Sequence, residues 1–462
     1  MERGALKILL WHGYLLSGSG SNVYTANVAK VWRAQGHDVL LLCQDRHAGE
    51  LPFVDEYGEF APDNDSVTSH PVSSAPAKGS LRVARPDIGE ILPVYVWDPY
   101  EGFTAKRFVD LDDDELAHYV RTNVDAITTA VTTFEPDVVI IGHEVMGPAI
   151  ARQVREQTGI GYSVKLHGSA LEYAVKKQAR YTDAARDGFA TADTVVGTSH
   201  YMCDAAAAAV PGDWTSRTAV VNPGCDVDVF VPAERDPAAP PTVGFVGKLI
   251  AAKGPQNLLA ALGRTTAPGL RTTLVGYGDF ADGLRELHDA LRSGRVGDAR
   301  KAVADDPSNA HCREFLDSAD VDDPYLARLA EVPVTWAGRL DHDRLPHALT
   351  GFDILVVPSE VPEAFGMVGA EACAAGVIPI VPRHSGIGEI GTAAEEVLGL
   401  PGLLSYDPAD PVRGLAERID AVLAHDAADR ADMAATLVKL AHDRWSWTKV
   451  AEGLLTACTA RA

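Results

Sequence analysis

Short apolar runs recur along the whole chain, and most of them end in glycine, serine or histidine before a stretch with helical spacing begins. Runs rich in valine, isoleucine and leucine are typical of strands that are buried on both faces. Their alternation with helical stretches predicts βαβ units and parallel sheets. The runs are LKILLWHG, DVLLLCQ, PDVVIIGH, YSVKLHG, DTVVGTS, TAVVNPG, PTVGFVGK, RTTLVGYG, VPVTWAGR, FDILVVPS and VIPIVP. The predicted fold class is therefore α/β, with doubly wound sheets.

The length predicts two domains, because 462 residues exceed one ordinary core. The alternation pauses at VPAERDPAAPP, residues 231–241, which is rich in proline, alanine and charge. We therefore expect a Rossmann-like first domain over 1–235 and a Rossmann-like second domain over 236–440. The stretch RWSWTKVAEGLLTA has apolar residues at helical spacing, so we expect a closing helix within 441–462 that packs back on the first domain.

Two segments depart from this pattern. Residues 54–90 contain APDNDSVTSHPVSSAPAKG and are interpreted as a long, partly mobile excursion. Residues 281–331 have mostly helical spacing and lie between two expected strands, so they predict a helical insertion.

Charge and composition exclude several classes of partner. The formal net charge is -23, from 41 basic and 64 acidic residues, whereas general nucleic-acid binding needs a basic face. The six cysteines are scattered, without the close pairs of zinc or redox sites. Every apolar run is shorter than the roughly 20 residues of a membrane helix. We expect a soluble cytoplasmic protein with reduced thiols and no nucleic-acid partner, and we leave open whether it forms a homo-oligomer.

Ligands of doubly wound domains bind beyond the carboxyl ends of the strands, and the first such loop here is SGSGSN, residues 17–22. Gly18 and Gly20 allow a ligand to approach the backbone closely. The third glycine of the dinucleotide fingerprint is replaced by Val23, and Asp45 is the nearest acid after the second strand. We therefore expect no nicotinamide cofactor. The loop remains either a plain tight turn or a ligand loop.

Polar residues end other strands of the first domain. His167 ends YSVKLHG, and His12, His143 and Glu144 also stand at strand ends. A histidine at such a place is a proton carrier, a hydrogen-bond donor to a sugar hydroxyl, or a satisfied core group. No histidine-rich metal spacing is present, so no metal site is expected.

Two lysines flank a strand-to-helix loop in the second domain, VGFVGKLIAAKG. Lys248 and Lys253 at one strand end are able to clamp a diphosphate as two point charges. The alternative is a pair of solvated surface lysines, which is the usual fate of this residue.

Two glutamates of interest lie in the stretch PSEVPEAFGMVGAEACAAGVIPIV, which directly follows an apolar strand. If a helix begins near Gly366, Glu363 lies in the loop before it and Glu371 lies inside it. A helical path between them is at most ~12 Å, which suits two ends of one elongated ligand. Carboxylates accept hydrogen bonds from vicinal hydroxyls, and a nucleotide sugar has a diol at each end and a diphosphate between them.

The chain resembles the family 4 retaining glycosyltransferases, which have the GT-B fold of two Rossmann-like domains that face a central crevice. The motifs that carry the resemblance are VGK and KG around the two lysines, GRL at 338–340, PSEVPEAFGMVGAEACAAGVIPIV, GLLSYDPADP, WSWTKVAE, GSGSNVYT, KLHGS and NPGCDVDVF. It implies that Glu363 binds the donor sugar and Glu371 the ribose. It also implies donor-binding or catalytic positions at His167, Gly20, Gly247, Lys248, Lys253, Phe365, Gly366, Met367 and Val368.

The resemblance implies a retaining reaction without a protein nucleophile, in which the leaving phosphate takes the proton of the acceptor. No metal is required if lysines and a helix dipole neutralise the diphosphate. The implied donor is a UDP-sugar, with a GDP-sugar as the alternative, and the resemblance implies that the first domain binds the acceptor. We expect this acceptor to be a soluble small molecule, because the basic stretch AVKKQARY is the only support for a membrane-bound one. Lys248 stands where arginine is more usual in the family. A sugar-nucleotide epimerase, a phosphorylase or a non-catalytic nucleotide-sugar-binding protein on the same fold remains an alternative.

Overall fold

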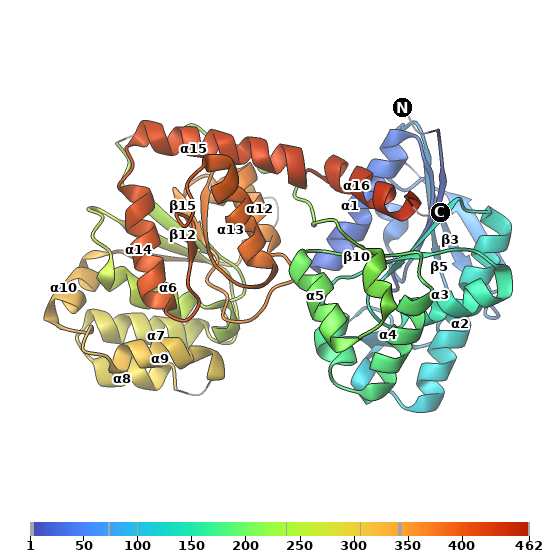
Figure 1. The fold of residues 1–462 in the computed structure, drawn as a ribbon, viewed down its shortest axis with the longest axis horizontal. Helices are drawn as coiled ribbons and strands as arrows, with labels where there is room; N and C mark the ends of the chain where they lie inside the picture. The colour runs from blue at the N-terminus through green and yellow to red at the C-terminus, as the bar shows by residue number, and fades with distance from the viewer. Residues whose placement is uncertain are drawn as a thin grey trace. The chain divides into compact units, whose positions relative to one another are not determined.

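The computed structural model describes residues 4–72, 74–98, 100–236, 238–304, 306–340 and 344–460. The chain forms two compact units. Unit 1 runs to Pro223 and resumes at Trp447, and unit 2 runs from Gly224 to Ser446. In Figure 1 the body of unit 1 is blue to green, and unit 2 runs from light green through yellow to red. Each unit is a mostly parallel sheet with helices, as the apolar runs predicted.

Unit 1 contains a sheet of nine strands within the described residues, in the order β11-β10-β9-β8-β1-β2-β5-β3-β4. Its pairs are parallel except β3 with β4. The strands are β1 (Lys7–Trp11), β2 (Asp38–Leu42), β3 (Glu56–Phe60), β4 (Val67–Pro71), β5 (Ser80–Arg85), β8 (Val138–Gly142), β9 (Ser163–Lys165), β10 (Thr194–Gly197) and β11 (Thr218–Val220). The helices are α1 (Gly20–Gln35), α2 (Asp113–Phe134), α3 (Gly147–Thr158), α4 (Ala179–Thr191), α5 (His200–Ala209) and α16 (Trp447–Thr459). A separate pair is β6 (Ile91–Val94) with β7 (Thr104–Arg107).

The expectation that residues 54–90 form an excursion was wrong for most of the segment. It supplies β3, β4 and β5, and β5 pairs with β2 to extend the sheet. In β3 the side chains of Tyr57 and Phe60 are buried, and in β5 those of Leu81 and Val83 are buried. These short runs are separated by clusters of proline, serine and aspartate, which favour turns and concealed the strands between them.

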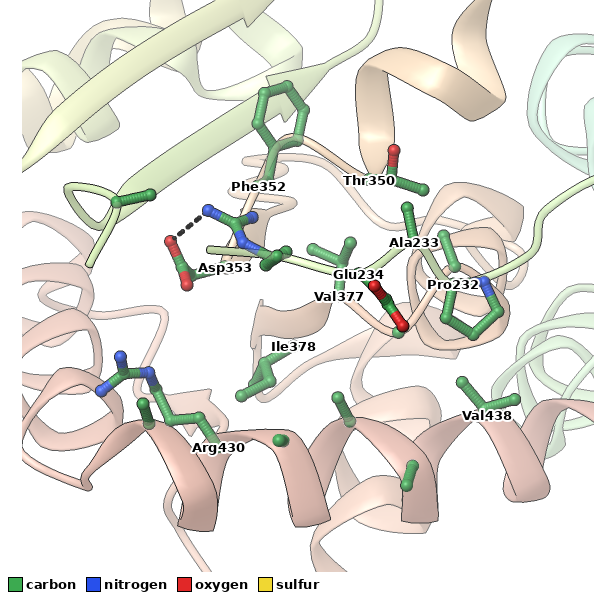
Figure 2. Close-up of a pocket in the computed structure, with 18 of the residues that line it drawn as sticks. Pro232, Ala233, Glu234, Thr350, Phe352, Asp353, Val377, Ile378, Arg430 and Val438 are labelled. Atoms are coloured by element: carbon green, nitrogen blue, oxygen red, sulfur yellow. Dashed lines mark hydrogen bonds and ion pairs between the residues drawn. The ribbon is translucent and has the colours of Figure 1, made fainter. Parts of the chain in front are cut away.

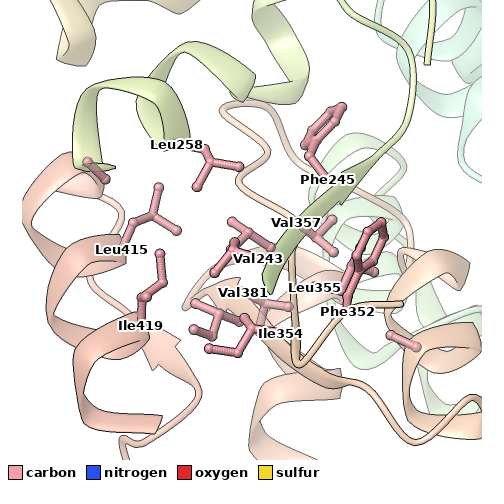
Figure 3. Close-up of a cluster of buried hydrophobic side chains, with 14 of the residues drawn as sticks. Val243, Phe245, Leu258, Phe352, Ile354, Leu355, Val357, Val381, Leu415 and Ile419 are labelled. Carbon is pink, nitrogen blue, oxygen red and sulfur yellow. The ribbon is translucent and has the colours of Figure 1, made fainter. Parts of the chain in front are cut away.

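Unit 2 contains a six-stranded parallel sheet within the described residues, in the order β14-β13-β12-β15-β16-β17. The strands are β12 (Thr242–Val246), β13 (Arg271–Val275), β14 (Val334–Gly338), β15 (Ile354–Val356), β16 (Ile378–Pro382) and β17 (Ser405–Tyr406). Helices outside the insertion are α6 (Pro255–Ala261), α11 (Leu345–Leu349), α12 (Met367–Ala374), α13 (Ser385–Leu398), α14 (Pro411–Leu423) and α15 (Ala427–Leu440). Figure 3 shows Leu258 of α6 and Leu415 of α14 packing beside β12 and β15.

The predicted insertion is helical. Between β13 and β14 the chain forms α7 (Ala281–Arg292), α8 (Val296–Ala302), α9 (Ala310–Asp317) and α10 (Asp323–Glu331). Its apolar faces join the core of unit 2 through Leu284, Leu291, Cys312 and Leu329, all fully buried. The insertion is therefore part of the same folded unit as the sheet, because they share one hydrophobic core.

The break between the units lies earlier than the expected boundary at 235/236. The chain leaves unit 1 at Pro223. The segment rich in proline belongs to unit 2, because Asp353 accepts hydrogen bonds from the side chain of Arg235 at 2.9 Å and from the backbone N–H of Thr242 at 2.8 Å. Figure 2 shows the first of these contacts as a dashed line. The composition of this segment indicated a linker, but a partly buried ion pair holds it on unit 2.

The closing helix is α16, and it belongs to unit 1. Its apolar face is buried and includes Trp447 and Leu454. The indole N–H of Trp32 in α1 donates to the carbonyl of Ala451 at 3.0 Å. Residues 441–446, which we expected in the closing segment, belong to unit 2, where Cys225 donates from its backbone to Trp445 at 2.8 Å. No helix among the described residues has both the length and the apolarity needed to cross a membrane.

Candidate active site

Three loops meet at the carboxyl edge of the sheet in unit 2. The first follows β12 and carries both lysines, over 247–254. The second follows β15 and carries Glu363, over 357–366, and the third follows β16 at 383–384. Because β12, β15 and β16 are adjacent and parallel, their carboxyl ends lie at one edge. This is the edge at which doubly wound sheets bind ligands.

An ion pair joins the first two loops. The ammonium of Lys253 lies 2.8 Å from Oε1 of Glu363, and these side chains are 34% and 14% exposed. The hydroxyl of Ser359 donates to the same oxygen. The backbone N–H of Glu363 donates to Oγ of Ser385 at 3.0 Å. Among the described residues no partner binds Oε2, so this carboxylate is fixed in place and keeps one oxygen for a ligand.

A glycine permits the two loops to meet. Gly254 has φ +72°, and a Cβ atom there would stand 1.8 Å from the carbonyl oxygen of Pro358. Both the left-handed backbone and the lack of space exclude a side chain. The KG dipeptide therefore places Lys253 against the acidic loop, a contact that the sequence analysis did not anticipate.

The predicted helix after Gly366 is present as α12, and Glu371 lies within it. Gly366 is its N-cap residue with φ +89°. The backbone N–H groups of the first turn, which includes Met367 and Val368, have no partners within the helix and favour an anion. The ring of Phe365 is buried against Trp445, with centroids 6.0 Å apart, so only its backbone is available to a ligand.

Glu371 is a partly buried carboxyl group whose side chain makes no hydrogen bond to another side chain among the described residues. Burial raises its pKa from the ordinary 4.5 to about 7. A carboxylate in such surroundings is costly unless a ligand supplies donors. The group is therefore suited to a ligand that brings hydroxyl donors.

The raised pKa predicts how stability changes with pH. Between about 4.5 and 7 the folded state keeps the proton of Glu371 and the unfolded state has lost it. The free energy of unfolding should fall as pH rises through this window, by at most about 1.4 kcal/mol per pH unit from this group. Glu371→Gln should lack that contribution. Urea unfolding of both proteins at several pH values within the window measures the difference, and parallel curves would contradict the shift.

The two lysines differ in their surroundings. Lys248 is exposed and Lys253 is half-buried beside Glu363. Gly247 directly follows β12, and its N–H donates to Val275 at 3.0 Å. The structure thus brings Lys253 and Glu363 together and leaves Lys248 on the surface. Whether Lys248 binds phosphate stays a prediction.

Three histidines at strand ends of unit 1 form a cluster, which the sequence analysis did not predict. The ring centroids of His143 and His167 are 4.8 Å apart, and those of His12 and His143 are 5.2 Å apart. Burial lowers the pKa of His12 to about 4 and holds the pKa values of His143 and His167 well below the ordinary range. These imidazoles are therefore neutral near pH 7, and His167 is suited to hydrogen bonding.

Glu144 fixes the backbone beside His167. Its Oε1 accepts the N–H groups of Gly168 at 2.7 Å and His167 at 3.2 Å. Burial raises the pKa of this carboxyl group to about 7. The first-domain loop is where it was expected: Gly20 begins α1, after the N-cap residue Ser19. Asp45 binds the backbone of Leu16 at 2.9 Å and thus has a local structural role.

Ser359, His384 and Ser385 were missed in the sequence analysis. Nε2 of His384 lies 3.0 Å from the carbonyl oxygen of Ser359, and its Nδ1 lies 2.9 Å from Oγ of Ser385. All three follow apolar strands directly, in VVPS and IVPRHS. That position at strand ends is the signal that would have found them.

A cavity of about 510 Å³ lies elsewhere in unit 2. It is bounded by the amino ends of β15 and β16, by residues 232–236 and by α15, and Figure 2 shows Ile378 and Arg430 at its wall. None of the predicted site residues lines it. The cavity is therefore separate from the loops that carry Lys253 and Glu363.

Family models cover most of the chain. Residues 19–224 match the model described as a glycosyl transferase 4-like domain, and residues 321–437 match the model described as glycosyl transferases group 1. The chain belongs to the GT-B glycosyltransferases. The resemblance seen in the motifs is thus confirmed, and Glu363 and Glu371 lie within the second match.

Relatives of this GT-B chain include two curated mycobacterial proteins. The D-inositol 3-phosphate glycosyltransferase of Mycolicibacterium smegmatis is 27% identical over 255 residues, which are 52% of this chain and 47% of that protein. The glycogen synthase of Mycobacterium tuberculosis is 31% identical over 243 residues, 52% of this chain and 48% of that protein. The chain spans about half the length of these curated relatives. Among solved structures, Anabaena HepE in complex with UDP has a TM-score of 0.60 at 16% identity and covers 98% of this chain and 100% of that one.

Proposed function

We propose that this chain is a retaining glycosyltransferase that moves a sugar from a nucleotide-sugar donor to a hydroxyl of a soluble small-molecule acceptor. The observation that carries the proposal is the Lys253–Glu363 pair at the carboxyl edge of the sheet, 2.8 Å apart, beside the amino end of α12. It combines a cation for phosphate, a carboxylate for hydroxyls and a helix end for anions in one place.

In this proposal the donor lies along the three loops. Its ribose hydroxyls donate to Glu371, and its diphosphate binds the first turn of α12 and Lys253. The sugar hydroxyls donate to Glu363, which then needs less charge from Lys253. The ammonium is thus free to stabilise the phosphate as the bond breaks.

The reaction needs no protein nucleophile. The acceptor oxygen forms a bond to the anomeric carbon on the face from which the phosphate oxygen departs. The acceptor proton passes to that phosphate oxygen, and the nucleoside diphosphate leaves. His167 is neutral and would hold a hydroxyl of the acceptor, which is a positioning task. We propose that Lys253 and the helix dipole neutralise the leaving group without a metal ion.

The comparisons support particular substrates. HepE, which has the same fold, was solved with UDP, and this supports a UDP-sugar over a GDP-sugar. The name of the inositol 3-phosphate glycosyltransferase, a relative, supports a soluble polyol as acceptor. Because the acceptors of this relative and of the glycogen synthase differ so much, the acceptor is proposed only as a soluble hydroxyl compound.

The proposal is tested by incubating the protein with UDP-glucose and, separately, GDP-mannose, with and without a pool of small polyols and sugars. We expect release of the free nucleotide, faster with an acceptor, and no loss of activity in EDTA. The product should keep the anomeric configuration of the donor, as read by NMR. An isomerised donor would indicate an epimerase. Binding without turnover would indicate a sensor.

Glu371 should control the affinity for the nucleotide itself. We expect Glu371→Ala to weaken UDP binding by ~1.5–3 kcal/mol, the worth of a charged hydrogen bond. Wild-type affinity should also rise as pH increases through about 7, because hydroxyls donate to the ionised form. Calorimetry with UDP below and above that pH checks both effects. Glu371→Gln is the control, because any pH dependence that it keeps comes from titration of the UDP phosphate. Unchanged UDP affinity in Glu371→Ala would show that Glu371 does not bind the ribose.

A further inference from the structure

The helical insertion contacts the acidic loop of the donor site. Nδ1 of His311, at the start of α9, lies 2.8 Å from Oε2 of Glu360. The side chain of Glu360 is only 9% exposed, and His311 is the basic side chain that pairs with it among the described residues. The amide of Asn257 in α6 donates to its other oxygen, Oε1. A carboxylate so well buried depends on these two donors.

The insertion also contacts the lysine loop. The side-chain amide of Gln256 donates to the carbonyl of Ala251 at 2.9 Å and to the carbonyl of Ser308 at 3.1 Å. Ser308 belongs to the short 3-10 turn directly before α9. The backbone N–H of Glu360 donates to Ala252 at 3.0 Å. The two donor-site loops and the insertion thus form one hydrogen-bonded assembly.

Glu360 is the neighbour of Ser359 and lies one loop turn before Glu363. Ser359 donates to Glu363. The position of the backbone at Glu360 therefore determines where the Ser359 hydroxyl and the Glu363 carboxylate lie. Without His311, the carboxylate of Glu360 would lose one hydrogen-bond donor, and little solvent would be present to replace it. It would be drawn outward to water, and the backbone of Ser359 would follow.

We propose that His311 is a positioning residue for the donor site: by binding Glu360, the insertion fixes the loop that presents Ser359 and Glu363. The functional part of this inference rests on the proposed transferase activity. Its structural part does not, since the assembly exists in the free protein.

Hydrogen exchange of the free protein tests the structural part. Amides of the loop 357–366 should exchange about ten-fold faster in His311→Ala, because the bonds from Glu360 to Ala252 and from Glu363 to Ser385 open more often. His311→Asn keeps a donor near the position of Nδ1 and should restore the slow rate. Glu314→Ala changes an exposed residue of the same helix and should leave it unchanged.

A second variant keeps the test decisive if His311→Ala unfolds. Glu360→Ala should accelerate the same amides, and the double variant should exchange no faster than either single one, because both remove one interaction. Equal loop exchange in the wild type and both alanine variants would overturn the proposal. Failure of His311→Asn to slow exchange would also overturn it.

Kinetics with UDP-glucose then test the functional part. We expect kcat/KM to fall about ten-fold in His311→Ala while Kd for free UDP stays within about two-fold, because the loop faces the sugar and Glu371 faces the ribose. If the wild type turns over neither UDP-glucose nor GDP-mannose, the proposed function fails while the exchange result still decides the role of His311. An active wild type with an equally active His311→Ala variant would refute only the role of His311.

Discussion

Replacing Glu363 with glutamine is expected to reduce sugar transfer by about 100-fold or more while binding of free UDP changes by no more than about two-fold. The carboxylate is held by Ser359 and Lys253, and it is 14% exposed. In the proposed complex it accepts hydroxyls of the sugar and does not touch the nucleotide. Glutamine has nearly the same shape but offers a single acceptor oxygen and no charge.

Steady-state kinetics and calorimetry with UDP measure the two effects of Glu363→Gln separately. Glu286→Gln is the matched control, because it removes an exposed carboxylate from α7 in the same unit. Its activity should equal that of the wild type. If activity and UDP affinity fall together in Glu363→Gln, the assignment of this residue to the sugar is wrong.

Lys253→Ala is expected to lower kcat by about 100-fold or more and to raise KM far less, because its charge is needed most as the phosphate leaves. The variant also deprives Glu363 of the cation 2.8 Å away. Lys248→Ala should have a smaller effect, about ten-fold at most, since Lys248 is exposed and has freedom to move. Lys248→Arg should be tolerated or even improve turnover, because a guanidinium grips phosphate with two bonds.

The measurement is a comparison of kcat and KM for these variants with one donor. Lys439→Ala, which removes a lysine that is 79% exposed, is the control for loss of positive charge. Near wild-type kcat in both Lys248→Ala and Lys253→Ala would show that both lysines are solvated surface residues with no role in the transfer. A rise in KM alone for Lys253→Ala would mean that it binds the ground state and not the departing phosphate.

Much of the fold was predictable from periodicity. Each of the eleven apolar runs contains a strand. Most of these strands are largely buried, and a strand buried on both faces needs an almost continuous apolar sequence. The strands β3 and β4 lie at one end of the sheet of unit 1, where such continuity is not required. In β4 every residue is exposed, so no apolar pattern was available to reveal it.

The candidate site was predictable only in part. Glu363, Lys253 and His167 were found because residues at the ends of parallel strands gather at one edge. The pairing of Lys253 with Glu363 spans 110 positions, and that of His311 with Glu360 spans 49. Such contacts depend on the order of the strands and on how the insertion packs. Neither can be predicted from the local spacing of residues in the sequence. The neutral state of His167 likewise comes from neighbours contributed by other strands.

The path of the chain between the units has a consequence for biosynthesis. Unit 2 is continuous and is complete once Ser446 has left the ribosome, whereas unit 1 also needs α16, which is made after the whole of unit 2. Until then Trp32, fully buried in the finished protein, lacks the helix whose carbonyl it binds. Unit 1, whose synthesis begins first, is therefore completed later. The apolar surface that α16 covers in the finished protein stays exposed while unit 2 folds.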